Sequence, residues 1–245
     1  MADIKDITPY NSDENSKKSQ VQGMFDKIAP NYDFLNRFLT LGIDVTWRKK
    51  AIAQLNGLPA DKVLDVATGT ADLAIEEAHK LPVKSIIGMD LSPQMLSIGE
   101  TKVKKDGLQN VISLETGDSE NLRFSDDEFD IITAGFGVRN FENLEKGLKE
   151  MYRVLKPGGT MMILEFSKPR VFPLKQLFNI YFSSILPLIG KLKSKDNRAY
   201  KYLYESVQAF PDYDDFTNIL KNIGFKNTKW KALSFGICSI YTAQK

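Results

Sequence analysis

Alternating segments in the middle of the chain predict strands and helices that follow one another. Short apolar runs, of the kind that form buried strands, are separated by segments with apolar positions at helical spacing. The strand-like runs are residues 62–67, 85–90, 111–116, 129–134 and 160–166, and the helical segments are 72–80, 93–105 and 144–155. This alternation is typical of a parallel sheet with helices on both faces. Residues 156–159 predict a turn before the last of these strands.

The C-terminal part departs from this alternation. A helix is expected at residues 213–223, and two strand-like runs follow at 226–234 and 238–243. Only residues 235–237 separate the two runs, and so short a connection joins only an antiparallel pair. We therefore predict an α/β, Rossmann-like fold with a mostly parallel sheet and a C-terminal antiparallel hairpin. This is the layout of class I methyltransferases, which use S-adenosylmethionine.

The N-terminal part predicts a polar lead-in followed by cap helices. Residues 1–20 are polar and lack apolar periodicity, so we expect a mostly disordered segment without a chemical role. From Val21 to Leu39, apolar residues recur at three- and four-residue steps, which predicts an amphipathic helix that Pro30 interrupts. Residues 21–245 are expected to form one domain, with cap helices at 21–56 and an insertion or lid at 170–210.

Residues 171–192 form the most apolar stretch of the chain. Lys175, Gln176, Asn179 and Pro187 interrupt it, whereas a membrane-spanning helix needs about 20 predominantly apolar residues. Two interpretations stay open. The stretch packs on the sheet as core, or it forms with residues 25–39 an apolar lid that receives a prenyl tail and contacts the membrane surface. In the second interpretation, three lysines meet anionic headgroups, namely Lys191, Lys193 and Lys195.

Composition narrows the range of partners. The 33 Lys and Arg residues nearly balance the 31 Asp and Glu residues, so the chain lacks the large positive net charge that would favour nucleic acid as a partner. The single cysteine, Cys238, and the single histidine, His79, exclude an internal disulfide and a His- or Cys-based metal centre. We expect no metal, although a carboxylate-only magnesium site stays open. The N-terminus lacks a signal-peptide pattern, which favours the cytoplasm. Oligomeric state stays open, a homodimer included.

Three successive predicted strands end in an acidic residue, namely Asp65, Asp90 and Asp118. Ligands of open α/β sheets bind beyond the carboxyl ends of the strands. Asp90 follows Gly69 by about 20 residues, the spacing of an acid that hydrogen-bonds ribose hydroxyls. Asp118 suits an acceptor for an adenine amino group, although an Asx turn is the plain alternative. The three acids together predict a nucleoside site at this edge of the sheet.

Charge at the first strand end favours S-adenosylmethionine over a dinucleotide. A pyrophosphate requires a glycine-rich loop without a carboxylate beside it, whereas Asp65 stands there and Gly69 is the only glycine of the loop. S-adenosylmethionine presents an ammonium that Asp65 attracts and a carboxylate that helix-start amides near Thr70 accept. The alternative is that Gly69 only forms a tight turn and that Asp65 only caps a helix.

Two blocks of the sequence resemble the menaquinone and ubiquinone biosynthesis C-methyltransferase family. The first comprises residues 25–36 and 41–48, and the second comprises 135–140, 151–159 and 164–169. The resemblance runs from about Val21 to the C-terminus. It implies a seven-stranded methyltransferase fold that acts on a polyprenylated quinol. The acceptor in this family is 2-demethylmenaquinol, and in some members 2-methoxy-6-polyprenyl-1,4-benzoquinol.

The resemblance also implies donor-binding residues, carried over to Thr70, Asp90, Asp118 and Ser119. Two positions depart from the family's pattern. Ala71 stands where most members have a second loop glycine, so we expect a negative φ at this residue. Gly135 stands where some members bind the donor through a serine, which removes one hydrogen bond.

The expected chemistry requires a stabilised quinolate, because loss of a hydroxyl proton makes the neighbouring ring carbon nucleophilic. Arg139, beside Asn140 in the loop after the fourth strand, is the candidate partner of that oxyanion, directly or through a water. The alternative for Arg139 is a structural ion pair. Tyr32 and Asp33 in the cap helix are further candidates.

Other functions stay open at this point. An NAD-dependent oxidoreductase would need further loop glycines. A non-catalytic S-adenosylmethionine-binding protein would not need the Arg139 and Asn140 pair. A methyltransferase of the same fold that acts on RNA or on another small molecule is the strongest competitor, although no basic stripe with aromatic residues favours RNA. We expect a cytoplasmic protein with peripheral contact at the inner face of the membrane.

Overall fold

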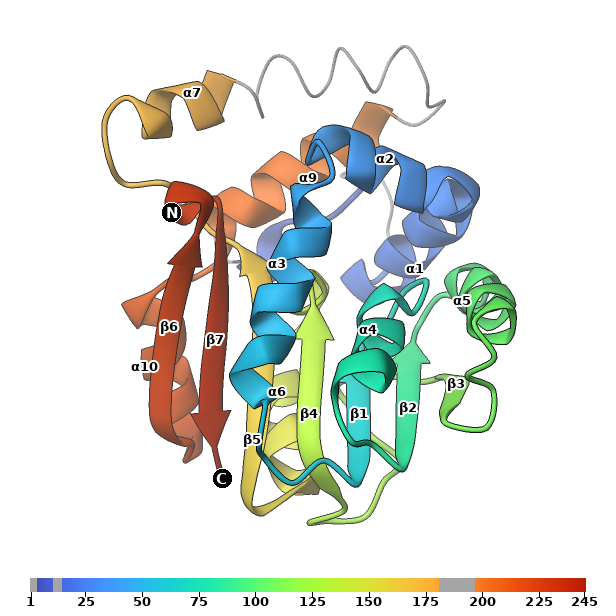
Figure 1. Ribbon diagram of the computed structural model, residues 1–245. Helices are drawn as coiled ribbons and strands as arrows, with labels where there is room; N and C mark the ends of the chain where they lie inside the picture. Colours follow the sequence, from blue (N-terminus) through green and yellow to red (C-terminus); the bar gives the residue numbers. More distant parts are fainter. Residues whose placement is uncertain (1–3, 11–14, 181–196) are drawn as a thin grey trace.

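The computed structural model describes residues 4–10, 15–180 and 197–245, and it contains a seven-stranded sheet of order β3-β2-β1-β4-β5-β7-β6. Strand β7 runs antiparallel to β5 and β6, and the other neighbours are parallel. The strands are β1 (Lys62–Val66), β2 (Ser85–Asp90), β3 (Ile112–Thr116), β4 (Phe129–Gly135), β5 (Leu155–Phe166), β6 (Lys226–Leu233) and β7 (Cys238–Gln244). This arrangement confirms the predicted fold class and the C-terminal antiparallel pair (Figure 1).

Helices cover both faces of the sheet, because the central strands are apolar on both sides. Val63 and Ile131 pack with α3, α4 and α5, whereas Leu64 and Ile132 pack with α6 and α10. The helices of these two layers are α3 (Ile43–Ile52), α4 (Asp72–Lys80), α5 (Pro93–Lys105), α6 (Leu144–Val154) and α10 (Asp214–Ile223). These two layers do not cover the carboxyl ends of the parallel strands, and the cap helices lie over those ends (Figure 1).

Strand β5 starts at Leu155, five residues before the expected start at Thr160. The pairing of β4 with β5 shifts register between Phe129 and Ile131, and Gly158 has a φ of 79°. An irregularity of this kind keeps extra residues in the strand while bending it. The predicted turn at residues 156–159 is therefore part of an irregular strand.

The N-terminal helix α1 (Lys17–Ile28) begins before Val21, because the Ser16 hydroxyl caps it by accepting a hydrogen bond from the Ser19 amide. Ile4, in the short turn η1 (Ile4–Asp6), is buried, and Lys17 Nζ donates to its carbonyl oxygen at 2.6 Å. The expectation that residues 1–20 are disordered is therefore wrong for residues 4–6 and for the start of α1. Residues 1–3 and 11–14 lie outside the described residues.

The cap helices lie over the carboxyl ends of the parallel strands (Figure 1). Helix α1 ends just before Pro30, as expected. Pro30 lies in the turn η2 (Ala29–Asn31), and α2 (Tyr32–Leu39) follows. The remaining helical elements of the described residues are η3 (Ala53–Leu55), η4 (Val138–Asn140), α7 (Leu174–Ile180), α9 (Asn197–Ala209) and η6 (Ser234–Gly236).

Residues 171–180 of the apolar stretch 171–192 are described, and most of their large apolar side chains are exposed. Phe178 is buried, whereas Val171, Phe172, Leu177 and Ile180 are each more than half exposed. The interpretation as ordinary core therefore fits only Phe178 among these residues. The rest of the stretch, with Pro187 and Lys191, and the lysines at 193 and 195 that follow it lie outside the described residues. Within the described ranges, no helix is both long and apolar enough to cross a membrane.

Candidate active site

Two cavities meet at the carboxyl ends of the parallel strands. The narrow cavity measures about 60 Å³ and lies against the ends of β1, β2 and β4 and against α1. The wide cavity measures about 580 Å³ and lies between α2, α3, α7 and α9. Four residues line both cavities, namely Phe25, Tyr32, Phe136 and Asn140. A group that passes from one cavity to the other must therefore pass these four side chains.

Asp90 ties together the two loops that frame the narrow cavity. Its Oδ2 accepts the backbone N–H of Gly69 at 2.8 Å, and its Oδ1 accepts that of Ser92 at 2.9 Å. Burial raises the pKa of this carboxyl, although the two backbone hydrogen bonds oppose the shift. Each carboxylate oxygen can accept a second hydrogen bond and Asp90 lines the narrow cavity, so its side chain fits two adjacent ribose hydroxyls.

Asp65 lies beneath the loop and does not line the narrow cavity. Its side chain is fully buried and accepts hydrogen bonds from the hydroxyls of Thr68 at 2.6 Å and Thr133 at 3.1 Å. Burial raises the pKa of Asp65 to about 7, against the effect of both hydroxyls. Glu77 of α4 is also fully buried, and burial together with the Asp65 charge raises its pKa. Two acids thus share one dry region below the loop.

Thr70 connects the loop to the cap helices. Its hydroxyl donates to Asp33 Oδ1 at 2.6 Å, and Lys102 Nζ donates to Asp33 Oδ2 at 2.9 Å. Lys102 also pairs with Asp72, whose pKa falls because Arg48 and Lys102 outweigh the effect of burial. Thr70 therefore holds α2 against the loop, and it lines neither cavity.

The expected negative φ at Ala71 is wrong, since this residue has a φ of 62°. Its amide donates to Thr68 O at 3.0 Å, and its side chain is fully buried. Ala67 and Gly69 also have positive φ values, of 55° and 57°. The loop thus keeps the left-handed turns that a glycine would favour, and the surrounding packing holds two alanines in them.

The loop after β3 brings Ser119 into the narrow cavity and turns Asp118 toward the N-terminal helix. Asp118 Oδ2 accepts from Lys18 Nζ at 2.7 Å, and its Oδ1 accepts the Glu120 N–H at 2.9 Å. Gly135, at the end of β4, lines the same cavity, and a Cβ built there would lie 3.3 Å from Leu73 Cδ2.

The next glycine marks the closest approach of two loops. A Cβ at Gly137 would lie 2.5 Å from that of Ala67, so any larger residue would push the loops after β1 and β4 apart. Phe136, between Gly135 and Gly137, has a φ of 58°, which is unusual for a bulky residue. This backbone places the Phe136 ring between the two cavities.

Aromatic rings form the floor of the wide cavity. Phe136 and Phe166 have ring centroids 4.8 Å apart, and Trp47 lies 6.2 Å from both. The Trp47 indole N–H donates to the Ser234 hydroxyl at 2.8 Å, which fixes the ring. Such a floor suits a flat ring stacked on aromatic faces.

Arg139 is buried at the edge of this floor and pairs with Glu165. The Nη1 to Oε1 distance is 2.7 Å, and Nη1 also donates to the Phe136 carbonyl. The structural ion pair is therefore present. Within the described part of the chain, however, Arg139 Nε and Asn140 Oδ1 are buried without a hydrogen-bond partner. Both residues line the wide cavity, so each unpaired atom is a candidate partner for a ligand bound there.

Tyr32, the first residue of α2, lines both cavities at the place where they meet. Its ring packs edge to face on Phe25, with centroids 6.0 Å apart, and burial raises its pKa. A phenol that stays protonated is a hydrogen-bond donor rather than a base at neutral pH.

The structure brings Gly69, Asp90, Ser119, Gly135, Tyr32 and Asn140 together at the narrow cavity and Arg139 at the wide one, whereas Asp65, Thr70 and Asp118 lie one layer away. Sequence reasoning missed Lys18, Asp26, Lys102 and Tyr202. Asp26 accepts the Ser92 hydroxyl at 2.5 Å and stands in the first family-like block, which was a usable signal. Lys18 and Lys102 lie on polar helix faces, where a lysine carries no signal. Among the described residues, no group of three His, Cys, Asp or Glu side chains could hold a metal ion.

Solved structures of low sequence identity share this fold. A methyltransferase of Thermotoga maritima that depends on S-adenosylmethionine superposes with a TM-score of 0.65 at 19% identity, covering 91% of this chain and 99% of that chain. A phosphoethanolamine N-methyltransferase of Haemonchus contortus, in complex with S-adenosyl-L-methionine, gives 0.61 at 14% identity and covers 82% and 52%.

Relatives of higher identity span nearly the whole chain. A demethylmenaquinone methyltransferase of Bacteroides fragilis is 49% identical, covering 98% of this chain and 97% of the relative. One of Porphyromonas gingivalis is 43% identical over the full length of both. A ubiquinone/menaquinone biosynthesis C-methyltransferase of Geotalea daltonii is 47% identical and covers 94% and 97%. A family model matches residues 13–245, and the chain belongs to the ubiE/COQ5 methyltransferase family.

Proposed function

We propose that the protein transfers a methyl group from S-adenosylmethionine to a ring carbon of a polyprenylated quinol, with 2-demethylmenaquinol as the acceptor. One observation carries this proposal: a wide apolar cavity with an unpaired Arg139 nitrogen meets the nucleoside-type cavity beside Asp90. Family membership supports methyl transfer. The names of the Bacteroides and Porphyromonas relatives support the naphthoquinol over the benzoquinol.

In the proposed reaction, the ring carbon forms a bond to the methyl carbon as the bond between methyl and sulfur breaks. The quinol hydroxyl beside that carbon loses its proton before transfer, and the ring C–H proton leaves afterwards to restore the aromatic ring and the hydroxyl. The products are the methylated quinol, S-adenosylhomocysteine and one proton. The bound donor supplies the electrophilic methyl group. The protein therefore has to align the two reactants and stabilise the quinolate.

We assign donor binding to the narrow cavity. Asp90 holds the ribose hydroxyls, and Ser119 and Gly135 border the base and the sulfonium arm. Asp65, through Thr68, supports the loop from below. The cavity is smaller than the roughly 300–1,000 Å³ of typical ligand pockets, so we expect α1 to move outward when the donor enters. The wide cavity falls within that range.

We assign acceptor binding to the wide cavity. The ring lies on Phe136 and Phe166, and the Arg139 Nε–H is directed at the oxyanion that forms beside the reacting carbon. The guanidinium remains charged, so it stabilises the quinolate electrostatically while a water or the solvent takes the proton. Burial strengthens this attraction, because little water competes.

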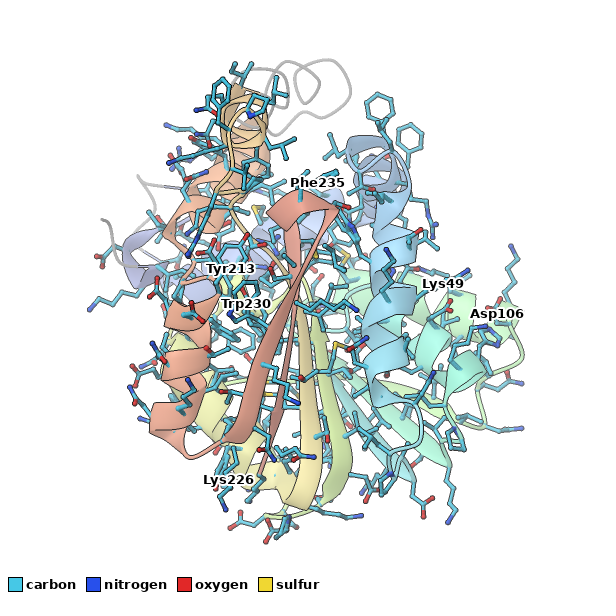
Figure 2. All side chains as sticks on the ribbon, turned by 60° about the vertical axis from the view of Figure 1, so that its left-hand side comes forward. Lys49, Asp106, Tyr213, Lys226, Trp230 and Phe235 are labelled. Atoms are coloured by element: carbon cyan, nitrogen blue, oxygen red, sulfur yellow. The ribbon has the colours of Figure 1, made fainter. Side chains whose placement is uncertain are left out.

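We also propose that the mouth of the wide cavity contacts the bilayer. Several exposed apolar side chains line the cavity and come from three separate segments, and the most exposed are Leu41, Leu177 and Phe235. Figure 2 shows Phe235 at the tip of the turn between β6 and β7, at the end of the molecule that carries the cap helices. An exposed apolar rim of this kind is typical of a membrane or partner contact, and a prenyl tail would leave the cavity here.

The test is methylation by the purified protein of chemically reduced demethylmenaquinone, with the corresponding demethylated benzoquinol and the oxidised naphthoquinone as parallel substrates. We expect methylated naphthoquinol and S-adenosylhomocysteine in equal amounts, and no product from the oxidised quinone. Methylation of the benzoquinol alone would move the acceptor to the ubiquinone pathway. No product from either quinol, in a protein that binds the donor, would contradict the proposal.

A further inference from the structure

Tyr202 of α9 carries a buried hydroxyl that no other described group satisfies. The residue is 2% exposed, and its Oη has no hydrogen-bond partner within the described ranges. Leaving a buried hydroxyl without a hydrogen bond destabilises the folded protein, so buried hydroxyls are nearly always paired. An unpaired one at a cavity wall is therefore a candidate ligand contact.

The Tyr202 hydroxyl belongs to the acceptor side of the site. Tyr202 lines the wide cavity and not the narrow one, and the charges of Arg139 and Glu165 are close enough to affect the pKa of its hydroxyl. Arg139 and Asn140, on η4, supply the other two unpaired buried atoms of the same cavity. Helix α9 and η4 are far apart in the sequence, so only the fold brings these three residues to one cavity.

The three unpaired atoms have complementary hydrogen-bonding types. Arg139 Nε–H is only a donor, Asn140 Oδ1 is only an acceptor, and the Tyr202 hydroxyl is both. A quinol that has lost one proton presents one oxygen that only accepts and one hydroxyl that also donates. An oxidised quinone presents two acceptors and would leave Asn140 Oδ1 unpaired. The set therefore matches the ionised quinol on both ring oxygens.

We infer that Tyr202 is a substrate-binding residue whose hydroxyl hydrogen-bonds a ring oxygen of the acceptor, completing with Arg139 and Asn140 a three-point clamp for the reduced ring. This inference rests on the proposed function, because it assigns a contact within the same acceptor site. The three hydrogen bonds fix the position and rotation of the substrate ring within its plane, whereas stacking on the aromatic floor fixes only the distance of the ring from that floor. The carbon that faces the donor is then determined by the clamp, which makes Tyr202 a determinant of specificity for the ring position.

The ring and the hydroxyl of Tyr202 have separate roles. The ring packs with Val21, Met24 and Ala199 and so joins α9 to the N-terminal helix α1. Burial raises the pKa of the phenol, so it stays protonated and acts as a hydrogen-bonding group rather than as a base. Removing only the hydroxyl therefore tests the inference without disturbing the packing.

The experiment compares Tyr202→Phe with Tyr204→Phe, a matched change on the same helix at a side chain that lines neither cavity. Turnover of reduced demethylmenaquinone is measured together with donor affinity and thermal unfolding. We expect Tyr202→Phe to lower kcat/KM for the quinol by about 10- to 100-fold, the loss of one hydrogen bond to a charged group. Donor affinity should stay at the wild-type value, and the unfolding temperature of the ligand-free protein should rise, because an unpaired buried hydroxyl is removed. Tyr204→Phe should match the wild type in turnover and donor affinity.

A second measurement uses binding of a quinol analogue and of its two monomethyl ethers, each of which lacks one ring hydroxyl. One of the ethers should bind the wild type more weakly than the quinol analogue does. With Tyr202→Phe, that ether should bind almost as well as the quinol analogue, because the substitution has already removed the contact that the ether lacks. The inference is overturned if Tyr202→Phe keeps kcat/KM within about twofold of the wild type, or if donor affinity falls in parallel. Failure of the proposed function is distinguishable, because the wild-type protein itself would then leave the quinol unmethylated.

Discussion

Lys18 of α1 pairs with Asp118 after β3, with 2.7 Å between Nζ and Oδ2. This contact joins a helix near the N-terminus to the strand end that we expected to hold the adenine amino group. Burial lowers the pKa of Lys18, but the hydrogen bond to Asp118 and the charge of Glu120 outweigh this effect, so the pKa is raised overall. An ammonium thus occupies an oxygen that an amino group of the donor would use, and α1 closes the narrow cavity.

The first prediction concerns this pair. Lys18→Met should strengthen S-adenosylmethionine binding by up to about fivefold, because the adenine amino group no longer displaces an ion pair worth at most about 1 kcal/mol at this exposure. Lys49→Met, at an exposed position of α3 (Figure 2), is the control for loss of charge. The measurement is titration calorimetry at low and at high salt. Weaker binding by Lys18→Met would show instead that Lys18 closes over the bound donor.

The second prediction concerns Asp90. Asp90→Asn should weaken donor binding by about tenfold or more, because it removes a charged acceptor for the ribose and turns an amide N–H₂ toward the Gly69 or Ser92 amide. Equilibrium dialysis with labelled donor measures the change. Glu100→Asn, at an exposed acid of α5, should leave affinity unchanged. An unaltered affinity in Asp90→Asn would remove this residue from the donor site.

The third prediction separates the two roles of Arg139. Arg139→Ala alone should lower the free energy of unfolding by about 3–5 kcal/mol, because Glu165 is then left buried and charged. Adding Glu165→Gln should recover most of that loss. If Arg139 stabilises the quinolate, the stable double variant still has strongly reduced turnover with donor affinity retained. Urea unfolding and steady-state kinetics report the two effects, and full activity of the double variant would leave Arg139 with only a structural role.

The fourth prediction concerns pH. Because the folded protein raises the pKa of Asp65 from 3.8 to about 7 and also raises that of Glu77, it binds protons that the unfolded chain has released. This contribution to stability is present below about pH 4 and is lost as pH rises through about 7. The pKa of Asp90 is also raised, and this shift acts in the same direction.

A neutral replacement tests that sign. Glu77→Gln should raise the free energy of unfolding at pH 8 by about 1–3 kcal/mol and change it less at pH 5, since the cost of burying the ionised carboxyl disappears. Glu100→Gln is the exposed control. Denaturant unfolding across this pH range is the measurement. Equal offsets at both pH values would mean that Glu77 stays in one protonation state.

The fifth prediction concerns the mouth of the wide cavity. The pair Leu41→Ser and Phe235→Ser should reduce flotation with anionic vesicles and should lower turnover of long-chain quinol more than that of a prenyl-free quinol, because it removes exposed apolar surface at the rim. Trp230→Ser, on the outer strand β6 (Figure 2), removes an exposed aromatic side chain elsewhere. Unchanged flotation and equal turnover of both quinols would exclude this contact.

The sequence by itself determined the elements and the chemical class. The periodicity of residues 62–166 and the short link before Cys238 indicated the sheet and its C-terminal pair, because apolar spacing directly reflects which faces are buried. The acids that end three strands were visible for the same reason, since parallel strands bring their carboxyl ends to one edge. Asp90 shows this best, as it lies in the cavity where its spacing from Gly69 suggested.

Only the tertiary structure decided what lies between these elements. Ala71 takes a left-handed turn because Thr68 and the packing around its buried side chain impose it, which no residue-level preference predicts. Lys18 and Tyr202 were not foreseen, because their partners lie far away along the chain and helical periodicity marks a face without saying what it meets. A buried hydroxyl is a signal only once its lack of a partner is known, and that depends on how distant segments pack together.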